Sequence, residues 1–417
     1  MPTPKILVVG TTDDYIEKIR NNHPGRALFI TDVKERKTSL LPCPDPAEEL
    51  KGNLEEPFQV AGQLKEHLKT WDQVITGVTA FDCESLSLAS RIAREFGLSF
   101  PGLQAVELCR DKLKSKEIWR RDGLACPRAL LLDNQAQVGP SRSAIRGPVI
   151  LKPLSGAGSE LVFKCNDPDQ ARQAYGLISE RLARHPNRRL FHKPGNPVLM
   201  EEFICGDEFS CDFLITEKTT SIIRLARKYH MPNKPAGTIR AYMVPAPFPQ
   251  GAFREMLESI LFRAAKALGL SNIICMTDFI MQAQVPFLLE MTPRPGGDCL
   301  PDLIQMACGL DMLGLCLDLA EGKIPPMPIK TVWRPLVGLR LFSRKAGTIT
   351  ELDAEALRSE PGVLKVNLNR RIGDHITLPP ENYDSHILGQ VIFEAPPFED
   401  IERKLGRLES LFNLKVE

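Results

Sequence analysis

The chain has 417 residues, which at roughly 100–200 residues per domain predicts two to four domains. Hydrophobic residues make up 43% and charged residues 25% of the chain, as in average globular proteins. The formal net charge is +1, which argues against a general nucleic-acid binder, because such proteins carry a basic excess.

The cysteines and the apolar runs indicate a cytoplasmic protein without a membrane span. The 11 cysteines stand singly, without the CxxC spacing of a zinc ribbon, and an odd count suits a reducing compartment. We expect most of them to be small buried side chains. No stretch approaches the ~20 apolar residues of a membrane helix. The best candidate, Met312 to Ala320, contains Asp318 and predicts a buried helix.

The first 105 residues or so predict an open α/β sheet. The apolar run Lys5–Val9 ends at Gly10, as expected of a buried parallel strand. No GxGxxG fingerprint follows it, so the sequence does not support dinucleotide binding there. Two further strands and a helix closed by Gly97 are predicted at 28–30, 74–75 and 85–96.

The next hundred residues alternate between helix and strand patterns. Helices are predicted at 111–122 and 167–184, the second with Pro168 in its first turn. Strands are predicted at 130–132, 149–152, 161–165, 198–203 and 209–215.

The last part of the chain predicts a helix, a hairpin and a strand-rich tail. Residues 251–268 form an amphipathic pattern closed by Gly269. Strands at 276–282 and 287–292 are separated by a short turn. Pro325, Pro326 and Pro328 mark a boundary. Short strands with glycine turns follow, and a helix is predicted at 397–411.

Asp278 and Glu290 are the strongest candidates for chemistry. The predicted hairpin places them on adjacent antiparallel strands, where two carboxylates can bind Mg²⁺ together with phosphate oxygens. Glu290, Thr292 and Arg294 alternate along one strand and should share a face. Arg294 there could neutralise a transferring phosphoryl group. Ordinary surface charges would give the same spacing, but the prolines and glycines of residues 293–297 end the strand where a ligand could approach.

A second candidate is Lys152, which ends an apolar strand, with the loop Ser155-Gly156-Ala157-Gly158-Ser159 that follows it. Glycines let backbone N–H groups approach phosphates, and the lysine supplies charge. The Walker A sequence is absent, and a plain hairpin explains the same residues.

Weaker candidates lie on either side of this loop. Acceptors in Glu201-Glu202-Phe203-Ile204 and at Glu208 could bind an adenine amino group and ribose hydroxyls, or could simply form an acidic hairpin turn. Lys112 begins a helix, where solvated lysines are common.

One local basic cluster, Arg224 to His230 with Lys234 and Arg240, could receive a substrate carboxylate. The alternative is a solvated strand and loop.

The order of these motifs along nearly the whole chain resembles the ATP-grasp superfamily. The resemblance implies that Lys112 and Lys152 contact ATP, that Ser155, Gly156, Gly158 and Ser159 belong to a lid loop, and that Ile280 packs on adenine. It implies an adenine-binding hinge at Glu201, Glu202, Phe203 and Ile204, a ribose contact at Glu208, and metal ligands at Asp278, Glu290 and Thr292. Arg294, Lys152 and Arg240 are the catalytic candidates. Thr292 departs from the family pattern, which has Asn there.

The resemblance also predicts the fold class and its division: an ATP-grasp fold of mixed α/β and α+β class. The predicted parts are a Rossmann-like α/β domain (1–110), a lid subdomain (111–195), a large subdomain with the Mg-ATP site (196–330) and a β-rich cap (331–417). The stretch 290–298 and the tail look most like the L-amino-acid ligase and carnosine-synthase branch.

The implied activity is a carboxylate–amine ligase that uses ATP and Mg²⁺ or Mn²⁺, forms an acyl phosphate and releases ADP and phosphate. Small carboxylates and amines, expected to be amino acids, would be the substrates, with no nucleic acid or membrane partner. The resemblance also suggests a homodimer. Two alternatives stay open: a biotin-carboxylase-like or purine-pathway enzyme, and a non-catalytic nucleotide sensor, which the Thr292 departure favours.

Overall fold

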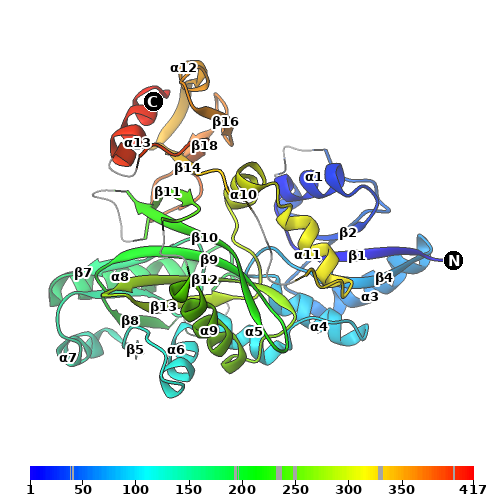
Figure 1. The fold of residues 1–417 in the computed structure, drawn as a ribbon, viewed down its shortest axis with the longest axis horizontal. Helices are drawn as coiled ribbons and strands as arrows, with labels where there is room; N and C mark the ends of the chain where they lie inside the picture. The colour runs from blue at the N-terminus through cyan, green and yellow to red at the C-terminus, as the bar shows by residue number, and fades with distance from the viewer. Residues whose placement is uncertain are drawn as a thin grey trace.

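The computed structural model describes residues 1–37, 39, 42–191, 195, 197–231, 237–247, 251–326, 332–397 and 400–417. Lys234 and Pro328, both named above, lie outside these ranges. Helices and strands contribute in comparable measure, and four separate sheets organise the chain (Figure 1).

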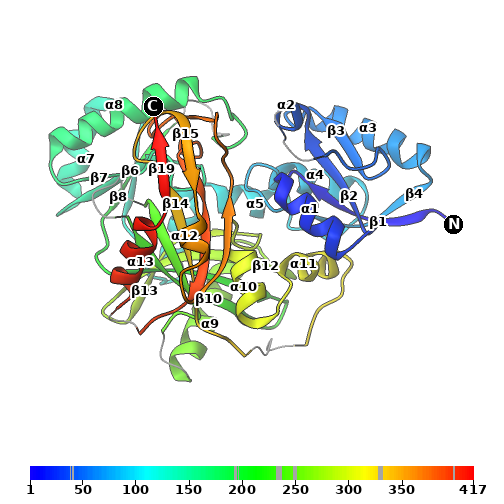
Figure 2. The same ribbon diagram turned by 90° about the horizontal axis from the view of Figure 1, so that it is seen from above.

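The N-terminal part is a four-stranded parallel sheet in the order β3-β2-β1-β4. Its strands are β1 (Thr3–Val9), β2 (Ala27–Asp32), β3 (Glu49–Gly52) and β4 (Gln73–Thr79). Its helices are α1 (Asp13–Asn22), α2 (Val33–Lys37), α3 (Pro57–Thr70), α4 (Leu86–Glu95) and α5 (Leu103–Arg110). β1 and β2 are buried almost throughout, because a parallel sheet with helices on its faces has no solvated side. Figure 2 shows this part standing beside the rest of the molecule.

A second sheet follows, antiparallel and in the order β5-β8-β6-β7. Its strands are β5 (Ala129–Leu132), β6 (Val149–Pro153), β7 (Phe163–Cys165) and β8 (Val198–Glu202). The helical elements around it are α6 (Lys112–Arg121), η1 (Gln135–Gln137), α7 (Val138–Ala144) and α8 (Pro168–Arg184). The carboxylates of Asp111 and Asp167 accept hydrogen bonds from the first turns of α6 and α8, which fixes where these helices begin.

The largest sheet has eight antiparallel strands in the order β13-β12-β9-β10-β11-β14-β18-β16. They are β9 (Asp207–Ile215), β10 (Thr220–His230), β11 (Ile239–Val244), β12 (Ile273–Gln282), β13 (Val285–Thr292), β14 (Leu336–Phe342), β16 (Val363–Leu368) and β18 (Ile387–Glu394). The helices of this region are α9 (Ala252–Ala267), α10 (Leu300–Cys308) and α11 (Met312–Ala320). The C-terminal strands therefore continue the sheet that contains the Asp278–Glu290 hairpin.

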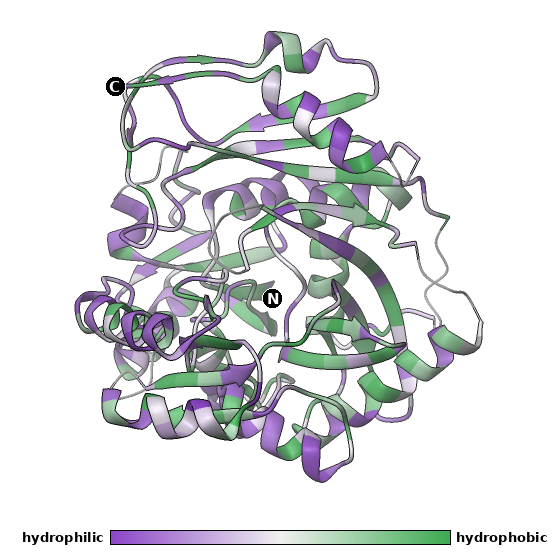
Figure 3. Cartoon of the chain, turned by 90° about the vertical axis from the view of Figure 1, so that its left-hand side faces the viewer, coloured by the Kyte–Doolittle hydropathy of each residue, from purple (hydrophilic) through white to green (hydrophobic). Residues whose placement is uncertain are grey.

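A small three-stranded antiparallel sheet completes the tail, in the order β17-β15-β19. Its strands are β15 (Gly347–Asp353), β17 (His375–Ile376) and β19 (Asn413–Val416), accompanied by α12 (Glu355–Arg358) and α13 (Ile401–Ser410). Hydrophobic and hydrophilic residues alternate along these strands and around the helices, as Figure 3 shows for the molecule as a whole.

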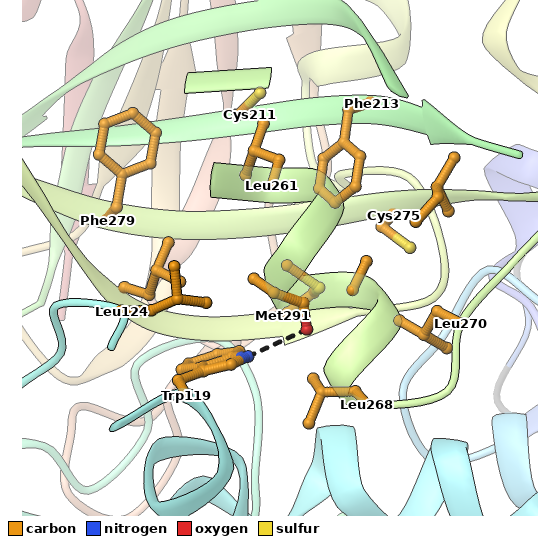
Figure 4. Packing of buried hydrophobic residues seen from close by; sticks show 14 of the residues in the cluster. Trp119, Leu124, Cys211, Phe213, Leu261, Leu268, Leu270, Cys275, Phe279 and Met291 are labelled. Atoms are coloured by element: carbon orange, nitrogen blue, oxygen red, sulfur yellow. Dashed lines mark hydrogen bonds between the residues drawn. The ribbon is translucent and has the colours of Figure 1, made fainter. Parts of the chain in front are cut away.

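The main apolar core lies between the large sheet and helices α6 and α9 (Figure 4). Trp119 of α6 is completely buried there, and its indole N–H donates to the carbonyl of Ala264 at 3.1 Å. A second core joins β1 to α10 and α11, with Ile6 packed near Ile304 and Leu317. Both cores pack helices against the large sheet, α6 and α9 in the first and α10 and α11 in the second.

Most of the predicted elements are present in the structure, with small shifts at their ends. The predicted turn between the hairpin strands is a two-residue turn at Ala283 and Gln284, both with positive φ. Arg294 is an exception: β13 ends at Thr292, and the Arg294 N–H donates to the Thr292 carbonyl in a tight turn. The prediction that Arg294 continues the strand is wrong, because the chain bends before reaching it.

Within the described ranges, no single helix is long and apolar enough to cross a membrane. Only α10 and α11 taken together pass that test, and they are bent by 102° relative to each other.

Candidate functional site

Two connected cavities lie where the second sheet, the large sheet and the N-terminal part meet. The first has a volume of about 350 Å³ and the second about 240 Å³. They share Lys112, Gly156, Ser159, Asp278 and Glu290 as wall residues. The two strongest sequence candidates therefore stand at the junction of the cavities.

The first cavity collects most of the residues predicted to contact a nucleotide. Its walls include Lys112, Lys152, Ser155, Gly156, Ser159, Glu201, Glu202, Phe203, Ile204, Glu208 and Ile280. Apolar side chains such as Ile150 and Leu289 give it a partly hydrophobic lining. Gly158 lies on the wall of the second cavity instead. A flat aromatic group bearing polar substituents suits such a lining.

Asp278 and Glu290 face each other across β12 and β13, as the register pairs them directly. The pairing shifts after Asp278, so that Phe279 stands opposite Leu288. This irregularity leaves the carbonyl of Leu289 to accept from the Lys116 ammonium at 2.6 Å. One oxygen of Asp278 is buried without a hydrogen-bond partner, which marks a position for a cation.

Four lysines surround these carboxylates and Glu201. The Lys152 and Lys116 ammonium groups lie 2.7 and 2.8 Å from the two oxygens of Glu201. Lys112 lies 3.7 Å from Glu290 and donates to the carbonyl of Gly156 at 3.2 Å. Lys228 lies 2.5 Å from Asp278. Two of these lysines, Lys116 and Lys228, were not singled out from the sequence.

The buried charged groups shift one another's pKa values. Burial opposes ionisation of Glu290, but the ammonium groups of Lys112 and Lys152 outweigh it and hold its pKa below the ordinary value. Burial raises the pKa of Asp278, and the Lys228 ammonium offsets this only in part. Burial also lowers the pKa of Lys116 to about 8. Glu290 is thus an ionised oxygen ligand beside a concentration of positive charge, a setting suited to phosphates.

Lys116 and Lys228 have different sequence signatures. Lys116 follows Lys112 by four residues on α6, so both lie on the same face of the helix, and this spacing could have identified it. Lys228 belongs to the basic cluster on β10, and nothing in its spacing separates it from its neighbours.

Arg294 lies on the second cavity with Thr292 and Glu290. Its Nε and one terminal nitrogen contact the Cys83 thiol at 3.3 and 3.1 Å, and the other donates to the Pro295 carbonyl at 2.6 Å. Over the ranges that the structure describes, no carboxylate forms an ion pair with it. A guanidinium in this position is a receptor for an incoming anion.

Arg240 lies on neither cavity. Its guanidinium is paired to Glu402 at 2.6 Å and to Glu409 at 2.8 Å on α13. Its bonds join β11 to the C-terminal helix, so the geometry gives no support to a catalytic role.

The other charged residues of the basic cluster that the structure describes are also paired with carboxylates. Arg224 is fully buried against Asp212 at 2.7 Å, and Arg227 pairs with Asp207. Lys228 and His230 share Glu208. The expectation of a solvated strand is wrong, because β10 runs through the centre of the large sheet, and its charges are balanced by carboxylates on β9 and β12.

The donor set fits Mg²⁺ bound together with a phosphate. In the described part of the chain, no three His, Cys, Asp or Glu side chains come close enough to hold a metal alone. Two carboxylates and a hydroxyl at Thr292 leave ligand positions for phosphate oxygens and water, which is how Mg²⁺ is usually held at nucleotide sites. The unpartnered Asp278 oxygen is consistent with this.

The sequence profile of the ATP-grasp domain family matches residues 145–302. Residues 145–302 therefore carry the pattern of an ATP-grasp domain. The matched segment runs from just before β6 to the first turn of α10, and it contains every site residue predicted from the sequence except Lys112. The predicted ATP-grasp fold is confirmed.

Individual relatives agree with this assignment. A D-alanine–D-alanine ligase from Acidovorax ebreus is 30% identical over 227 residues, covering 52% of this chain and 64% of the relative. An uncharacterized protein from Sinorhizobium fredii is 26% identical over 327 residues, covering 77% of this chain and 64% of its own length. The chain therefore spans slightly less than two thirds of these two relatives.

Two solved ATP-grasp structures show how far the fold is shared. An L-amino acid ligase from Bacillus licheniformis superposes with a TM-score of 0.79 at 17% identity over the full length of both chains. The biotin carboxylase domain of a 2-oxoglutarate carboxylase from Hydrogenobacter thermophilus, solved with MgADP, ADP and bicarbonate, gives a TM-score of 0.70 at 17% identity. That alignment covers all of this chain and 91% of the domain. At these identities the likeness concerns the fold alone.

Proposed function

We propose that the chain is an ATP-dependent carboxylate–amine ligase that forms an amide or peptide-like bond and releases ADP and phosphate. The observation that carries this proposal is the position of Asp278 and Glu290. They stand between a partly apolar cavity, with Lys112 and Lys152 on its wall, and a second cavity that contains the Arg294 guanidinium, which has no carboxylate ion-pair partner among the described residues.

ATP would occupy the first cavity. The adenine would lie between the segment Glu201–Ile204 and Ile280, with the ribose near Glu208. Lys152, Lys112 and the glycine loop Ser155–Ser159 would contact the phosphates, since ammonium groups and glycine N–H groups are the usual phosphate donors. The γ-phosphate would then point toward the second cavity.

Asp278, Glu290 and Thr292 would hold Mg²⁺, or Mn²⁺ in its place. The metal supplies charge neutralisation to the β- and γ-phosphate oxygens when it is bound. Thr292 offers a shorter oxygen donor than the family's Asn, so its part in the metal site is a specific point to test.

The chemistry follows from positioning and charge. A substrate carboxylate oxygen attacks the γ-phosphorus, the bond to the β-phosphate oxygen breaks, and ADP leaves. Arg294 and Lys152 stabilise the negative charge on the transferring group. A neutral amine then attacks the acyl carbon, phosphate departs with the bonding electron pair, and the new amide loses a proton. Closure of the glycine loop would keep water from the acyl phosphate.

We infer small-molecule substrates, with amino acids as the leading class, because the relatives include D-alanine–D-alanine ligases and the structural neighbours an L-amino acid ligase. The net charge of +1 gives no reason to expect a nucleic-acid partner. A cytoplasmic location and a homodimer remain proposals from the family resemblance.

The test is ADP and phosphate release with ATP and Mg²⁺, measured over a panel of amino acids and small acids, singly and in pairs. Stoichiometric ADP with an amide product is expected. Glu290→Ala should reduce turnover by at least about 10²-fold, because a directly bound carboxylate is lost beside the transferring phosphate. Stoichiometric AMP and pyrophosphate would rule the mechanism out, and a fully active Glu290→Ala protein would remove the metal assignment.

The same assay separates three other functions. A biotin-carboxylase-like activity is favoured by the fold shared with the carboxylase domain, and would show as turnover dependent on biotin and bicarbonate. The purine-pathway alternative would show as turnover on aminoimidazole ribonucleotide, the ligand in one structural neighbour. A nucleotide sensor would bind ATP without turnover under any condition, and Thr292 is the residue that favours it.

A further inference from the structure

An ion pair lies on the wall of the second cavity. A carboxylate oxygen of Asp298, which lies just before α10, is 2.5 Å from the Nε of Arg340 on β14. Both residues line the second cavity. The Arg340 guanidinium carbon lies 5.7 Å from the centre of the Tyr242 ring, which limits its movement on one side.

The pair keeps unused hydrogen-bonding capacity. Within the described ranges, the Oδ2–Nε contact is the only hydrogen bond that either side chain makes. The second oxygen of Asp298 and both terminal amino groups of Arg340 therefore have no hydrogen-bond partner among the described residues. Arg340 keeps 16% and Asp298 24% of its side-chain surface accessible. A ligand in the cavity can therefore bond to both residues while the ion pair stays intact.

The backbone at Asp298 is also unusual. Its φ is +61°, in the left-handed region that Asp tolerates better than most residues but that still costs energy. Its neighbours Gly296 and Gly297 line the same cavity. Backbone strain of this kind is often retained at a functional site, where it positions a side chain.

We propose that Asp298 and Arg340 bind the amine substrate as an α-amino acid zwitterion. The two terminal amino groups of Arg340 would hold its carboxylate in a fork, and the free oxygen of Asp298 would accept a hydrogen bond from its ammonium group. The same Asp298 oxygen would take one proton from that ammonium group before the neutral amine attacks the acyl phosphate. This inference rests on the proposed ligase function, since it names the amine that the acyl phosphate receives.

The charges explain why a zwitterion is preferred. An amine without a carboxylate would bring an unbalanced positive charge beside Arg340, and a plain acid would bring a negative charge beside Asp298. A zwitterion is neutral as a whole and satisfies both residues. A site that hydrogen-bonds a particular ligand group rejects analogues without that group, because the protein's own polar group is then left unpaired. This rejection is stronger than the discrimination of an apolar pocket.

The second guanidinium of the cavity then has a separate task. Arg294 lies beside Thr292 and Glu290, on the side of the transferring phosphoryl group. Arg340 comes from a C-terminal strand. One arginine would serve the substrate that is phosphorylated and the other the substrate that attacks. Ile239, Met276 and Leu300 complete the wall and offer an apolar surface to the amino acid's side chain.

The experiment compares each of the twenty amino acids with the full-length protein by titration calorimetry. The best ligand is then compared with its carboxamide and its decarboxylated amine. KM and kcat for the same compounds are measured by ADP release. The variants are Arg340→Gln, Arg340→Lys and Asp298→Asn. The control is Lys365→Gln, which removes a similar ion pair between the C-terminal strands and α10, to Asp302 at 2.9 Å, outside both cavities.

We expect wild type to prefer the amino acid over its carboxamide and its amine by at least about tenfold. Arg340→Gln should raise the KM of the amino acid, with a smaller effect on kcat, and so abolish its preference over the carboxamide. Arg340→Lys should retain part of that preference. Asp298→Asn should weaken amino-acid binding by about tenfold, and Lys365→Gln should leave every value unchanged.

The inference is overturned if no amino acid binds, if Arg340→Gln keeps the preference at an unchanged melting temperature, or if Lys365→Gln has the same effect as the cavity variants. Selective amino-acid binding that depends on both residues but is accompanied by no ADP release would leave the subsite standing and refute the proposed ligase activity instead.

Discussion

Among single residues, Arg294 is the clearest case of a partly buried charge that has no carboxylate ion-pair partner within the described ranges. Its contacts are a thiol and a carbonyl, although a buried guanidinium is normally matched by a carboxylate. Arg294 follows the end of β13 and does not continue the strand. It still lines the second cavity together with Glu290 and Thr292.

Arg294→Lys is expected to reduce turnover by about 10²-fold or more, the scale of losing one positioned donor in a transition state. Lysine keeps the charge but cannot present a planar fork to two oxygens. Steady-state ADP release and a thermal melt should be measured together. Normal turnover would argue against the role, and so would a loss of activity that only follows unfolding.

Asp82 is a second residue whose charge is shaped by burial. Burial and the Glu84 carboxylate raise its pKa to about 7, with Ser85 and Arg189 acting in the opposite direction. Because the folded pKa lies above the unfolded one, the folded protein holds more protons between about pH 4 and pH 7. Stability from this group is present at low pH and is lost as pH rises through 7.

Asp82→Asn should therefore raise the melting temperature at pH 8 by roughly 2 °C or more, and by less at pH 5, where only part of the destabilisation has developed. The amide oxygen can still accept the Ser85 N–H bond that Asp82 holds at 2.6 Å. Melting curves from pH 5 to pH 8 provide the test. A variant that is destabilised equally at both ends would contradict the pKa assignment.

At the scale of elements, prediction from the sequence was most accurate where a single local pattern determines the structure. The hairpin of β12 and β13 is an example, because alternation and a short turn suffice to bring Asp278 opposite Glu290. β3 was missed because Glu49–Gly52 has no apolar run. Its place is set by pairing with β2, which local patterns do not encode.

Charged residues were harder to place than apolar ones. Arg224 and Arg240 were expected to be solvated or to meet a substrate, yet each is paired with carboxylates distant in sequence or on another strand. A sequence shows the charge but not its partner, since pairing depends on the order of strands in the sheet. The same limit applies to Lys228 and to the Asp298–Arg340 pair.

The glycine loop depends on backbone conformations that other residues rarely adopt. Gly156 has φ +138°, and a Cβ there would lie 2.8 Å from the Phe191 ring. The ring is itself buried and packs edge-on against His185 at 4.5 Å. Lys112 donates to the Gly156 carbonyl, so a shift of the loop would also move a phosphate-binding lysine.

Gly156→Ala is expected to weaken ATP binding by about tenfold, the scale of a strained backbone residue. Nucleotide titration by calorimetry would measure this. Gly176→Ala is the matched control, because Gly176 lies in α8 with nothing within 4 Å of its added Cβ. Alanine should stabilise that helix slightly and leave ATP affinity alone. Equal affinities in both variants would contradict a nucleotide role for the loop.

At the scale of the whole molecule, the large sheet joins the candidate site to the C-terminal residues. The sheet runs from β13, which contains Glu290, through β11 to β14, β18 and β16. β11 and β14 pair from Ala241 opposite Leu339 to Val244 opposite Leu336. The C-terminal region predicted as a cap thus shares backbone hydrogen bonds with the strands of the site and supplies Arg340 to its second cavity.

A chain cut after residue 326 should therefore fail to fold as a soluble protein. It would leave β11 as an open edge, which promotes aggregation. It would expose buried Ala241 and Met243 and separate Arg240 from both of its glutamates.

Removing only residues 413–417 is the control, because β19 pairs with β15 alone in the small sheet. That shorter deletion should lower the melting temperature and still yield a soluble protein that binds ATP. Size-exclusion chromatography and nucleotide titration distinguish the two. If the chain ending at 326 were monomeric, melted cooperatively and bound ATP, the C-terminal strands would be an appendage to the site, and the contribution of β14 to the second cavity would have to be dispensable.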